Sequence, residues 1–181
     1  MRRVAGLLRA VNVGGRKVLM ADLRQVVSQA GFEAPQTLLA SGNVLFGTTL
    51  SAAETARTLE ATILKALGVA TDVMVRDHGD LAAVIAANPF PDIAKSRPNG
   101  LAAIFLSGEP QQELDCLKTA CIAGEDVRSG PGCLYVWFPN GLGNSRLSNA
   151  ILERRLSVRA TARNWNTVAR LEAALARPFS P

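Results

Sequence analysis

The order of short apolar strands and amphipathic helices constrains the fold of this chain most strongly. In the first half, apolar runs and alternating runs are typical of strands, and apolar side chains at a spacing of three and four residues are typical of helices. One helix begins with the capping pattern S-x-x-E at Ser51 and Glu54. The pair Ser41-Gly42 between two short strands predicts a tight hairpin. The expected elements are strands at 4–11, 36–40, 43–46 and 71–76, and helices at 20–30 and 51–67.

The second half repeats this order loosely. A continuous apolar strand comes first, and Glu109-Pro110 then opens a helix, with proline at a favoured first-turn position. A second hairpin brackets Gly130-Pro131-Gly132, and a helix, a weak strand and a final helix follow. The expected strands are 101–106, 126–129, 133–138 and 158–161, and the expected later helices are 147–156 and 167–175.

Both halves therefore have the order β-α-β-β-α-β, which is the ferredoxin-like arrangement. We expect an α+β protein made of two ferredoxin-like halves packed together, the second less regular than the first. Residues 1–87 form the first half, the proline-containing stretch 88–99 is the linker, and residues 100–181 form the second half with basic helices at its end.

The charge is distributed unevenly along the chain. The total is +5, from 20 basic and 15 acidic groups, but residues 1–31 carry +5, residues 32–145 carry −5, and residues 146–181 carry +5. The net negative charge of the middle segment therefore equals the net positive charge of one end in magnitude. A local anion site is therefore better supported than a diffuse surface for binding polyanions.

Several classes of protein are excluded or disfavoured. No apolar run approaches the roughly 20 residues of a membrane span. Arg9 interrupts the apolar stretch that resembles a signal peptide, so we expect a cytosolic protein. Three cysteines without C-x-x-C spacing indicate neither a disulfide framework nor a zinc site. The sequence shows no metal-hydrolase, glycosidase or serine-hydrolase pattern, and we expect neither a metal nor a cofactor.

The first candidate site is the glycine-containing loop between the first strand and the first helix. Backbone amides at two adjacent glycines can turn toward one point, and together with the following helix N-terminus they attract anions. The alternative is a simple glycine turn with solvated basic flanks. The candidate ligand-binding residues here are Arg9, Asn12, Gly14, Gly15, Arg16 and Lys17, with Ser41 and Asn43 of the hairpin expected nearby.

The second candidate site is another glycine-rich loop, residues 140–146. We expect Asn144 or Ser145 to cap the next helix and Arg146 to lie in its first turn. A basic residue there opposes the helix dipole, which favours a nearby anion. The alternative is an arginine paired with an acidic residue elsewhere in the fold.

The third candidate site is the segment Arg163-Asn164-Trp165-Asn166. Arginine can clamp a phosphate or carboxylate, and tryptophan can stack on a base. The alternative, favoured by residue type alone, is a helix start with an asparagine cap and a tryptophan in the core. Tyr135 and Trp137 lie on the same face of a predicted strand. A packed sheet face is a better interpretation of this pair than a stacking platform for bases.

The combination of these segments is more specific than any one of them. It resembles the bacterial family called domain of unknown function 1697 over roughly residues 3–176. The resemblance implies an α+β protein with ferredoxin-like parts and no established activity. Ala10 stands where the family often has glycine, and Arg146 where it often has lysine. The matching motifs are L-L-R at 7–9, N-V-G-G at 12–15, M-A-D-L-R at 20–24, S-G-N-V at 41–44, S-R-L at 145–147 and T-A-R-N-W-N-T-V at 161–168.

Three functions remain open at this level. The favoured one is binding of a phosphorylated or anionic ligand, a nucleotide or nucleic acid, in a groove between the halves. The second is an enzyme acting on a small phosphorylated or acidic substrate, for which Asp22, Ser41 and Ser145 are the available groups. The third is an interaction module whose sheet edges pair, so that the protein is a monomer or a homodimer. We expect no membrane partner.

Overall fold

The protein comprises two compact units in a computed structural model that describes residues 1–11 and 18–177. The first unit contains Met1–Gly79 together with Leu171–Pro181, and the second contains Asp80–Arg170. Residues 88–99, expected as a linker, include a short helix and lie within the second unit. The last turns of the final helix belong to the first unit.

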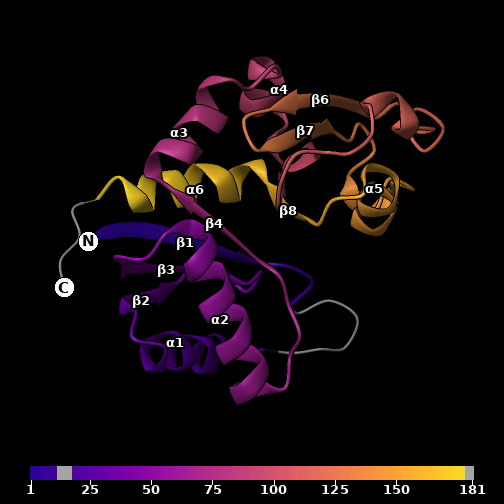
Figure 1. Ribbon diagram of the computed structural model, residues 1–181. Coiled ribbons are helices and arrows are strands. Elements are labelled where there is room, and N and C mark those ends of the chain that lie inside the picture. Colours follow the sequence, from indigo (N-terminus) through magenta and orange to yellow (C-terminus); the bar gives the residue numbers. More distant parts are fainter. Residues whose placement is uncertain (12–17, 178–181) are drawn as a thin grey trace. The chain divides into compact units, whose positions relative to one another are not determined.

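The first unit is built on a four-stranded antiparallel sheet with the order β2-β3-β1-β4 (Figure 1). Two helices, α1 (Met20–Gln29) and α2 (Ala52–Leu67), cover one face of this sheet. Its strands are β1 (Arg2–Leu8), β2 (Glu33–Thr37), β3 (Asn43–Thr48) and β4 (Val73–Asp77).

The core of the first unit follows from strand alternation and helical spacing. Val4 and Phe46 of the sheet pack with Leu23 of α1 and Ile63 of α2, and all four are fully buried. Full burial of such a side chain stabilises the fold by about 1.5–3 kcal/mol. Val4 and Phe46 are paired across β1 and β3, so their side chains lie on the same face of the sheet, the one that the two helices cover.

The expected capping pattern on α2 is confirmed. The Ser51 hydroxyl accepts a hydrogen bond from the Glu54 amide, and the Glu54 carboxylate accepts one from the Ser51 amide. At the other end Gly68 adopts a left-handed conformation with φ of 65°.

The hairpin between β2 and β3 is wider than the sequence predicted. Its loop spans residues 38–42 and is closed by a hydrogen bond from the Leu38 amide to the Asn43 carbonyl oxygen (3.0 Å). Leu39 and Gly42 have positive φ angles of 61° and 72°. Two left-handed residues reverse the chain over five positions, so Ser41-Gly42 does not form a two-residue turn by itself.

The second unit also has a four-stranded antiparallel sheet, with the order β6-β7-β5-β8. Its strands are β5 (Leu101–Leu106), β6 (Asp126–Gly130), β7 (Cys133–Trp137) and β8 (Ala160–Asn164). Its helical elements are α3 (His78–Ala86), which begins in the first unit, α4 (Pro91–Ser96), η1 (Pro98–Gly100), η2 (Leu114–Leu117), η3 (Leu142–Asn144), α5 (Asn149–Leu156) and α6 (Trp165–Leu175), which ends in the first unit.

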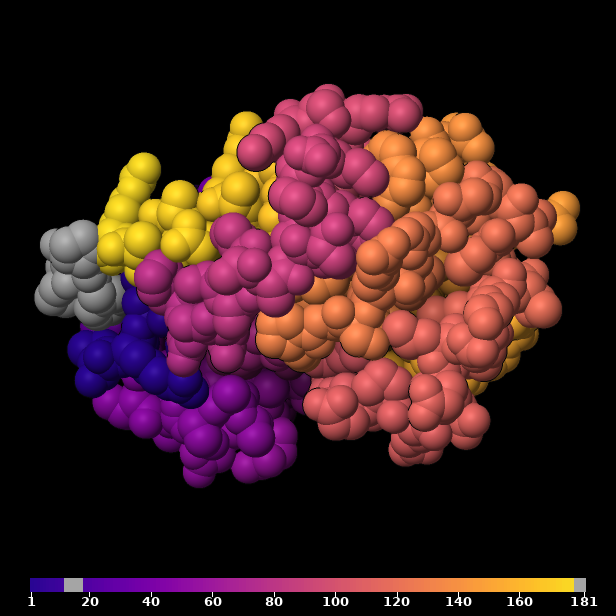
Figure 2. Space-filling model, turned by 90° about the horizontal axis from the view of Figure 1, so that it is seen from above, coloured from indigo at the N-terminus to yellow at the C-terminus, as the bar shows by residue number. Residues whose placement is uncertain are grey.

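Different elements cover the two faces of this second sheet. Ile104 and Leu134 pack with Leu117 of η2 and Leu152 of α5 on one face. On the other face, the Tyr135 hydroxyl donates a hydrogen bond to the Val84 carbonyl oxygen of α3 (2.7 Å). Figure 2 shows α3 and α4, in magenta, against the orange part of the same unit. The fold is thus mixed α+β, with two antiparallel sheets and helices packed on them.

One helix prediction in the second unit is wrong, and a second predicted helix is present but starts two residues later than expected. The helix expected from Glu109-Pro110 is helical only at η2, and the Gln111 amide before it donates to the Leu156 carbonyl oxygen (2.9 Å) at the end of α5. The helix after the second glycine loop begins at Asn149 and is capped by Ser148. Arg146 therefore precedes the cap, and the argument from the helix dipole does not apply to it.

Within the part of the chain that the structure describes, no helix is both long enough and apolar enough to cross a membrane.

Candidate ligand-binding site

The residues predicted from the first unit brace the end of β1. Asn43 is fully buried, and its side-chain amide donates to the Leu38 carbonyl oxygen (2.9 Å) and to the Ser41 hydroxyl (2.8 Å). The Leu8 amide donates to the Gly42 carbonyl oxygen (2.9 Å). Ser41 and Asn43 are thus brought together, and they hold the hairpin loop in its conformation.

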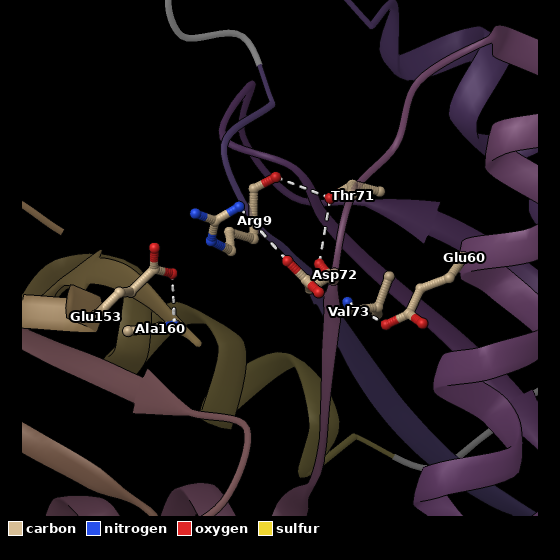
Figure 3. A network of polar contacts seen from close by, with 7 residues as sticks. All are labelled: Arg9, Glu60, Thr71, Asp72, Val73, Glu153 and Ala160. Atoms are coloured by element: carbon tan, nitrogen blue, oxygen red, sulfur yellow. Dashed lines mark hydrogen bonds and ion pairs between the residues drawn. The ribbon is translucent and has the colours of Figure 1, made fainter. Parts of the chain in front are cut away.

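Arg9 follows β1 and contacts the segment before β4. Its guanidinium lies 3.4 Å from the Asp72 carboxylate, and its carbonyl oxygen accepts a hydrogen bond from the Thr71 hydroxyl (2.7 Å) (Figure 3). The next residue, Val73, donates its amide to the Glu60 carboxylate of α2 (2.8 Å). These contacts fix where β4 enters the sheet.

The rest of the first predicted site, the glycine loop itself, lies outside the described residues. This applies to Asn12, Gly14, Gly15, Arg16 and Lys17. Their assignment to an anion site stays a prediction.

Ser145, from the second predicted site, links a buried carboxylate to the chain leading to α5. Its hydroxyl donates to the Glu125 carboxylate and accepts a hydrogen bond from the Leu147 amide (3.0 Å). Burial raises the pKa of Glu125, but hydrogen bonds from Ser145 and from the backbone amides of Glu125 and Ala123 outweigh it and lower the pKa overall. The neighbouring Arg146 is exposed.

Arg163 and Trp165, from the third predicted site, are buried. Arg163 is 5% exposed and donates to the Thr161 hydroxyl (2.7 Å) and the Ala162 carbonyl oxygen (2.8 Å). Burial lowers the pKa of its guanidinium to about 10. The ring of Trp165 lies 6.4 Å from that of Tyr135. Nearby, the Ala160 amide at the start of β8 donates to Glu153 of α5 (2.8 Å) (Figure 3).

The two asparagines of the third site fix the segment that precedes β5. The Asn164 side-chain amide donates to the carbonyl oxygens of Asn99 (3.0 Å) and Pro98 (3.4 Å). The Asn166 side-chain amide donates to the Asn99 side-chain oxygen (2.8 Å), and its backbone amide donates to the Asn164 side-chain oxygen (3.0 Å). Two asparagines at the start of α6 therefore hold Asn99 by its backbone and its side chain.

This segment forms one wall of a groove of about 490 Å³ in the second unit. The guanidinium carbon of Arg97 lies 5.0 Å from the centre of the Trp137 ring, and an Arg97 nitrogen donates to the Pro139 carbonyl oxygen (3.2 Å). The indole is half-buried, whereas Arg97 is exposed. The groove is lined by Ser96, Arg97, Pro98, Asn99, Gly100, Trp137, Phe138, Pro139, Asn140 and Gly141.

A glycine at position 100 allows Trp137 to lie where it does. A Cβ atom there would be 2.4 Å from Cζ3 of the indole and 3.0 Å from the Phe138 carbonyl oxygen. The backbone pairing is close because the Phe138 amide donates to the Gly100 carbonyl oxygen (2.8 Å). The absence of a side chain at Gly100 therefore sets the position of the aromatic wall.

The charge of the groove favours an anion. Arg97 is the one charged residue among those lining it, and no carboxylate of the described residues lies within ion-pair distance of Arg97. A guanidinium has five N–H donors, and one is used by Pro139. The groove thus offers an indole face, a guanidinium and side-chain amides.

The sequence alone did not lead to this groove. The sequence pattern places Trp137 in an alternating aromatic pair and predicts a linker at Arg97 and Asn99. The available signals were the Asn99-Gly100 pair before a strand and the glycine loop that begins at Asn140. Across the described residues, no group of three or more His, Cys, Asp or Glu side chains is placed to hold a metal ion.

Comparison with known proteins identifies the family. The family described as "protein of unknown function (DUF1697)" matches residues 1–135. The chain belongs to this family. The predicted family is thereby confirmed, with a match that ends at residue 135 and not near residue 176 as expected. Arg97 and Asn99 lie within the match, whereas Trp137, Asn164 and Asn166 lie beyond it.

A solved structure shares the fold of this DUF1697 protein. It is that of the conserved bacterial protein SP0830 from Streptococcus pneumoniae, with a TM-score of 0.74 and 21% sequence identity. The similarity covers 98% of this chain and 99% of that one. No curated protein matches the chain.

Proposed function

We propose that this DUF1697 protein binds a nucleotide in the groove between Arg97 and Trp137. The observation that carries the proposal is the Arg97 guanidinium above the Trp137 indole, at a groove with no acidic lining residue. The indole provides a stacking surface for a planar base, and the guanidinium provides donors for phosphate oxygens. The proposed site uses residues of the second unit alone.

In the proposed binding mode Arg97 exchanges its contact with the Trp137 indole for a contact with the ligand. In the free protein its guanidinium covers the indole, a contact worth about 0.5–1 kcal/mol at an exposed site. A base stacked on an aromatic side chain contributes about 1–3 kcal/mol. Arg97 can leave the ring and form charge-assisted hydrogen bonds with phosphate, so the ligand replaces a weak internal contact with two stronger ones.

The size of the groove agrees with a mononucleotide. Ligand sites in proteins span about 300–1,000 Å³, and this groove of about 490 Å³ lies within that range. A single indole and a single guanidinium match one base and one phosphate group. A polynucleotide site, in contrast, has several stacking side chains along a basic path.

Titration with uridine monophosphate (UMP) and guanosine monophosphate (GMP), followed by tryptophan fluorescence and calorimetry, tests the proposal. The chain has two tryptophans, so Trp165→Phe leaves Trp137 as the single reporter. We expect Arg97→Ala to weaken binding about tenfold through loss of the charge-assisted contact. Trp137→Leu should weaken it by about five- to 150-fold, the equivalent of a lost base stack.

Arg128→Ala is the matched control. Arg128 lies over an aromatic ring of the same unit, 5.1 Å from the centre of Phe90, but it does not line the groove. The control should bind like the parent protein. Equal weakening in Arg97→Ala and Arg128→Ala, or the absence of binding by either nucleotide, would contradict the proposal.

We further infer that each unit is a ferredoxin-like fold. The strand orders β2-β3-β1-β4 and β6-β7-β5-β8 are the same order when the strands of each unit are numbered from one, and every neighbouring pair is antiparallel. This is the order produced by β-α-β-β-α-β connectivity. In the second unit η2 stands in place of the first helix.

The enzymatic and oligomeric alternatives stay predictions. Of the groups considered for catalysis, Ser41 accepts a hydrogen bond from Asn43, and Ser145 binds Glu125, so both hydroxyls already have structural partners. Release of phosphate from UMP or GMP, and light scattering at two protein concentrations, test these alternatives.

A further inference from the structure

The start of α6 determines which hydrogen-bonding group the groove presents to a ligand. Asn99 lines the groove, and its side-chain oxygen accepts a hydrogen bond from the Asn166 side-chain amide (2.8 Å). A carboxamide has one oxygen acceptor and one NH₂ group with two donors. With its oxygen directed toward Asn166, Asn99 keeps both N–H donors of its NH₂ group for a ligand.

Asn164 holds the backbones of Asn99 and Asn166. The Asn164 side-chain oxygen accepts a hydrogen bond from the Asn166 backbone amide (3.0 Å), and the Asn164 side-chain amide donates to the Asn99 carbonyl oxygen (3.0 Å). Asn164 thus uses both its oxygen and its nitrogen, and this places the side chain of Asn166 against that of Asn99. Reversing one carboxamide would face donor with donor or acceptor with acceptor.

Asn99 lies beside the proposed stacking surface. It directly precedes Gly100, whose Cα faces the Cζ3 edge of the Trp137 indole, where an added Cβ would come within 2.4 Å. Asn99 and Trp137 line the same groove, so we place the edge of a base stacked on the indole beside the Asn99 carboxamide. Among the residues lining the groove, Arg97 is likewise a donor and has no acceptor.

We propose that the groove selects bases that carry a carbonyl oxygen at the position where cytosine and adenine carry an amino group. This selectivity rests on the proposed nucleotide site. Uracil and guanine present an acceptor there, at O4 and O6. Cytosine and adenine present NH₂ donors, which would face the Asn99 NH₂ group. In this scheme Asn99 contacts the base, and Asn166 and Asn164 are positioning residues.

The test compares UMP with cytidine monophosphate (CMP), and GMP with adenosine monophosphate (AMP), by calorimetry on the full chain. These pairs have the same phosphate and sugar and nearly the same shape, so their ratio isolates the base edge. We expect UMP and GMP to bind about tenfold more tightly than their partners, because the mismatched pair leaves a donor without an acceptor.

Asn166→Asp provides the decisive variant. A carboxylate at position 166 only accepts hydrogen bonds, so it should draw the Asn99 NH₂ group toward itself and leave the Asn99 oxygen for the ligand. The UMP-to-CMP ratio should then fall below one. The added negative charge weakens binding of all four nucleotides alike, so the ratio is the informative quantity and absolute affinity is not.

Asn88→Asp is the control for the added charge. Asn88 lies in the same unit outside the groove, and its side-chain oxygen accepts from the Phe90 amide, as an aspartate oxygen also does. This variant should keep the parental ratio. Asn166→Ala, with circular dichroism to confirm folding, should bring the ratio close to one because the Asn99 carboxamide is then free to turn.

The outcomes separate this inference from the proposed function. Binding of all four nucleotides with equal affinity, or a ratio unchanged in Asn166→Asp, overturns the selectivity and leaves nucleotide binding intact. Failure of all four to bind overturns the proposed function together with the selectivity that rests on it. A ratio that reverses in Asn166→Asp and not in Asn88→Asp supports both.

Discussion

Replacement of the single tyrosine by phenylalanine tests how the second unit is held together. Tyr135 is fully buried on β7, and its hydroxyl donates to the Val84 carbonyl oxygen of α3 (2.7 Å). The last four carbonyl groups of a helix lack intrahelical partners. The Asn88 amide, which would be the partner of Val84 in a longer helix, donates instead to Ile85 (3.3 Å). The tyrosine hydroxyl therefore satisfies a carbonyl group at the end of α3.

The expected cost of Tyr135→Phe follows from this geometry. Phenylalanine preserves the ring, which occupies the space beside Gly130, where a Cβ atom would come within 2.2 Å of the tyrosine ring. The variant therefore creates no large cavity. It leaves one buried carbonyl group without its partner, which costs about 1–3 kcal/mol of unfolding free energy. Urea unfolding followed by tryptophan fluorescence measures this, because both tryptophans belong to the second unit.

The same substitution predicts a change in pH dependence. Burial, followed by the neighbouring Cys133, raises the pKa of Tyr135 above its ordinary value. Above about pH 10 the unfolded chain releases the phenolic proton and the folded protein retains it, so stability falls as pH rises. The fall reaches at most about 1.4 kcal/mol per pH unit. The difference between parent and Tyr135→Phe should therefore shrink from about pH 8 to about pH 11.

A comparison of the parent protein with Tyr135→Phe cancels the effects on stability of the other groups that titrate in this pH range. Arg163, whose pKa burial lowers to about 10, has the opposite effect, because the folded state loses its proton before the unfolded state does. It is present in both proteins. The chain contains one tyrosine, so ultraviolet absorbance of tyrosinate reports Tyr135 directly. Equal urea midpoints at neutral pH, or an ordinary tyrosine titration in the folded protein, would refute the reasoning.

Two further substitutions test the loops of the predicted sites. Gly42→Ala places a Cβ atom 2.2 Å from a Val11 methyl group at a φ of 72°. In urea unfolding it should cost about 1–3 kcal/mol more than Gly31→Ala, where φ is 83° and no atom lies within 4 Å of the added Cβ. Equal costs would show that backbone strain alone acts. Ser145→Ala removes the hydroxyl that binds Glu125 and should cost about 1–3 kcal/mol at neutral pH. Because the pKa of Glu125 is lowered in the folded state, part of the parent protein's stability should disappear as pH falls below about 4.3, and Ser145→Ala should show a smaller acid loss. Identical acid unfolding of the two proteins would contradict this.

Local signals predicted much of the fold. The capping pair Ser51 and Glu54 and the strand Leu101–Leu106 lie where the sequence placed them. These features depend on neighbours within a few residues, so the sequence contains the whole interaction. The helix expected from Glu109 is wrong: this segment contacts the end of α5 through Gln111 and Leu156, which are 45 positions apart, and no local signal reveals that contact.

The groove could not be predicted for the same reason. Its aromatic wall depends on the pairing of β5 with β7, which brings Gly100 next to the indole of Trp137. Its polar wall depends on Asn166, which is 67 positions from its partner Asn99. The sequence shows that Asn164 and Asn166 carry many hydrogen-bonding groups, but it does not show which residues those groups bind.

The division of α6 between the two units has a consequence for synthesis of the chain. The first unit contains Met1–Gly79, which are made before the second unit, and also Leu171–Leu175, which are made after it. Arg3 donates to the Ala174 carbonyl oxygen (3.0 Å), and His78 lies 2.9 Å from Glu172. These two contacts of the first unit can therefore form only after every residue of the second unit has been made.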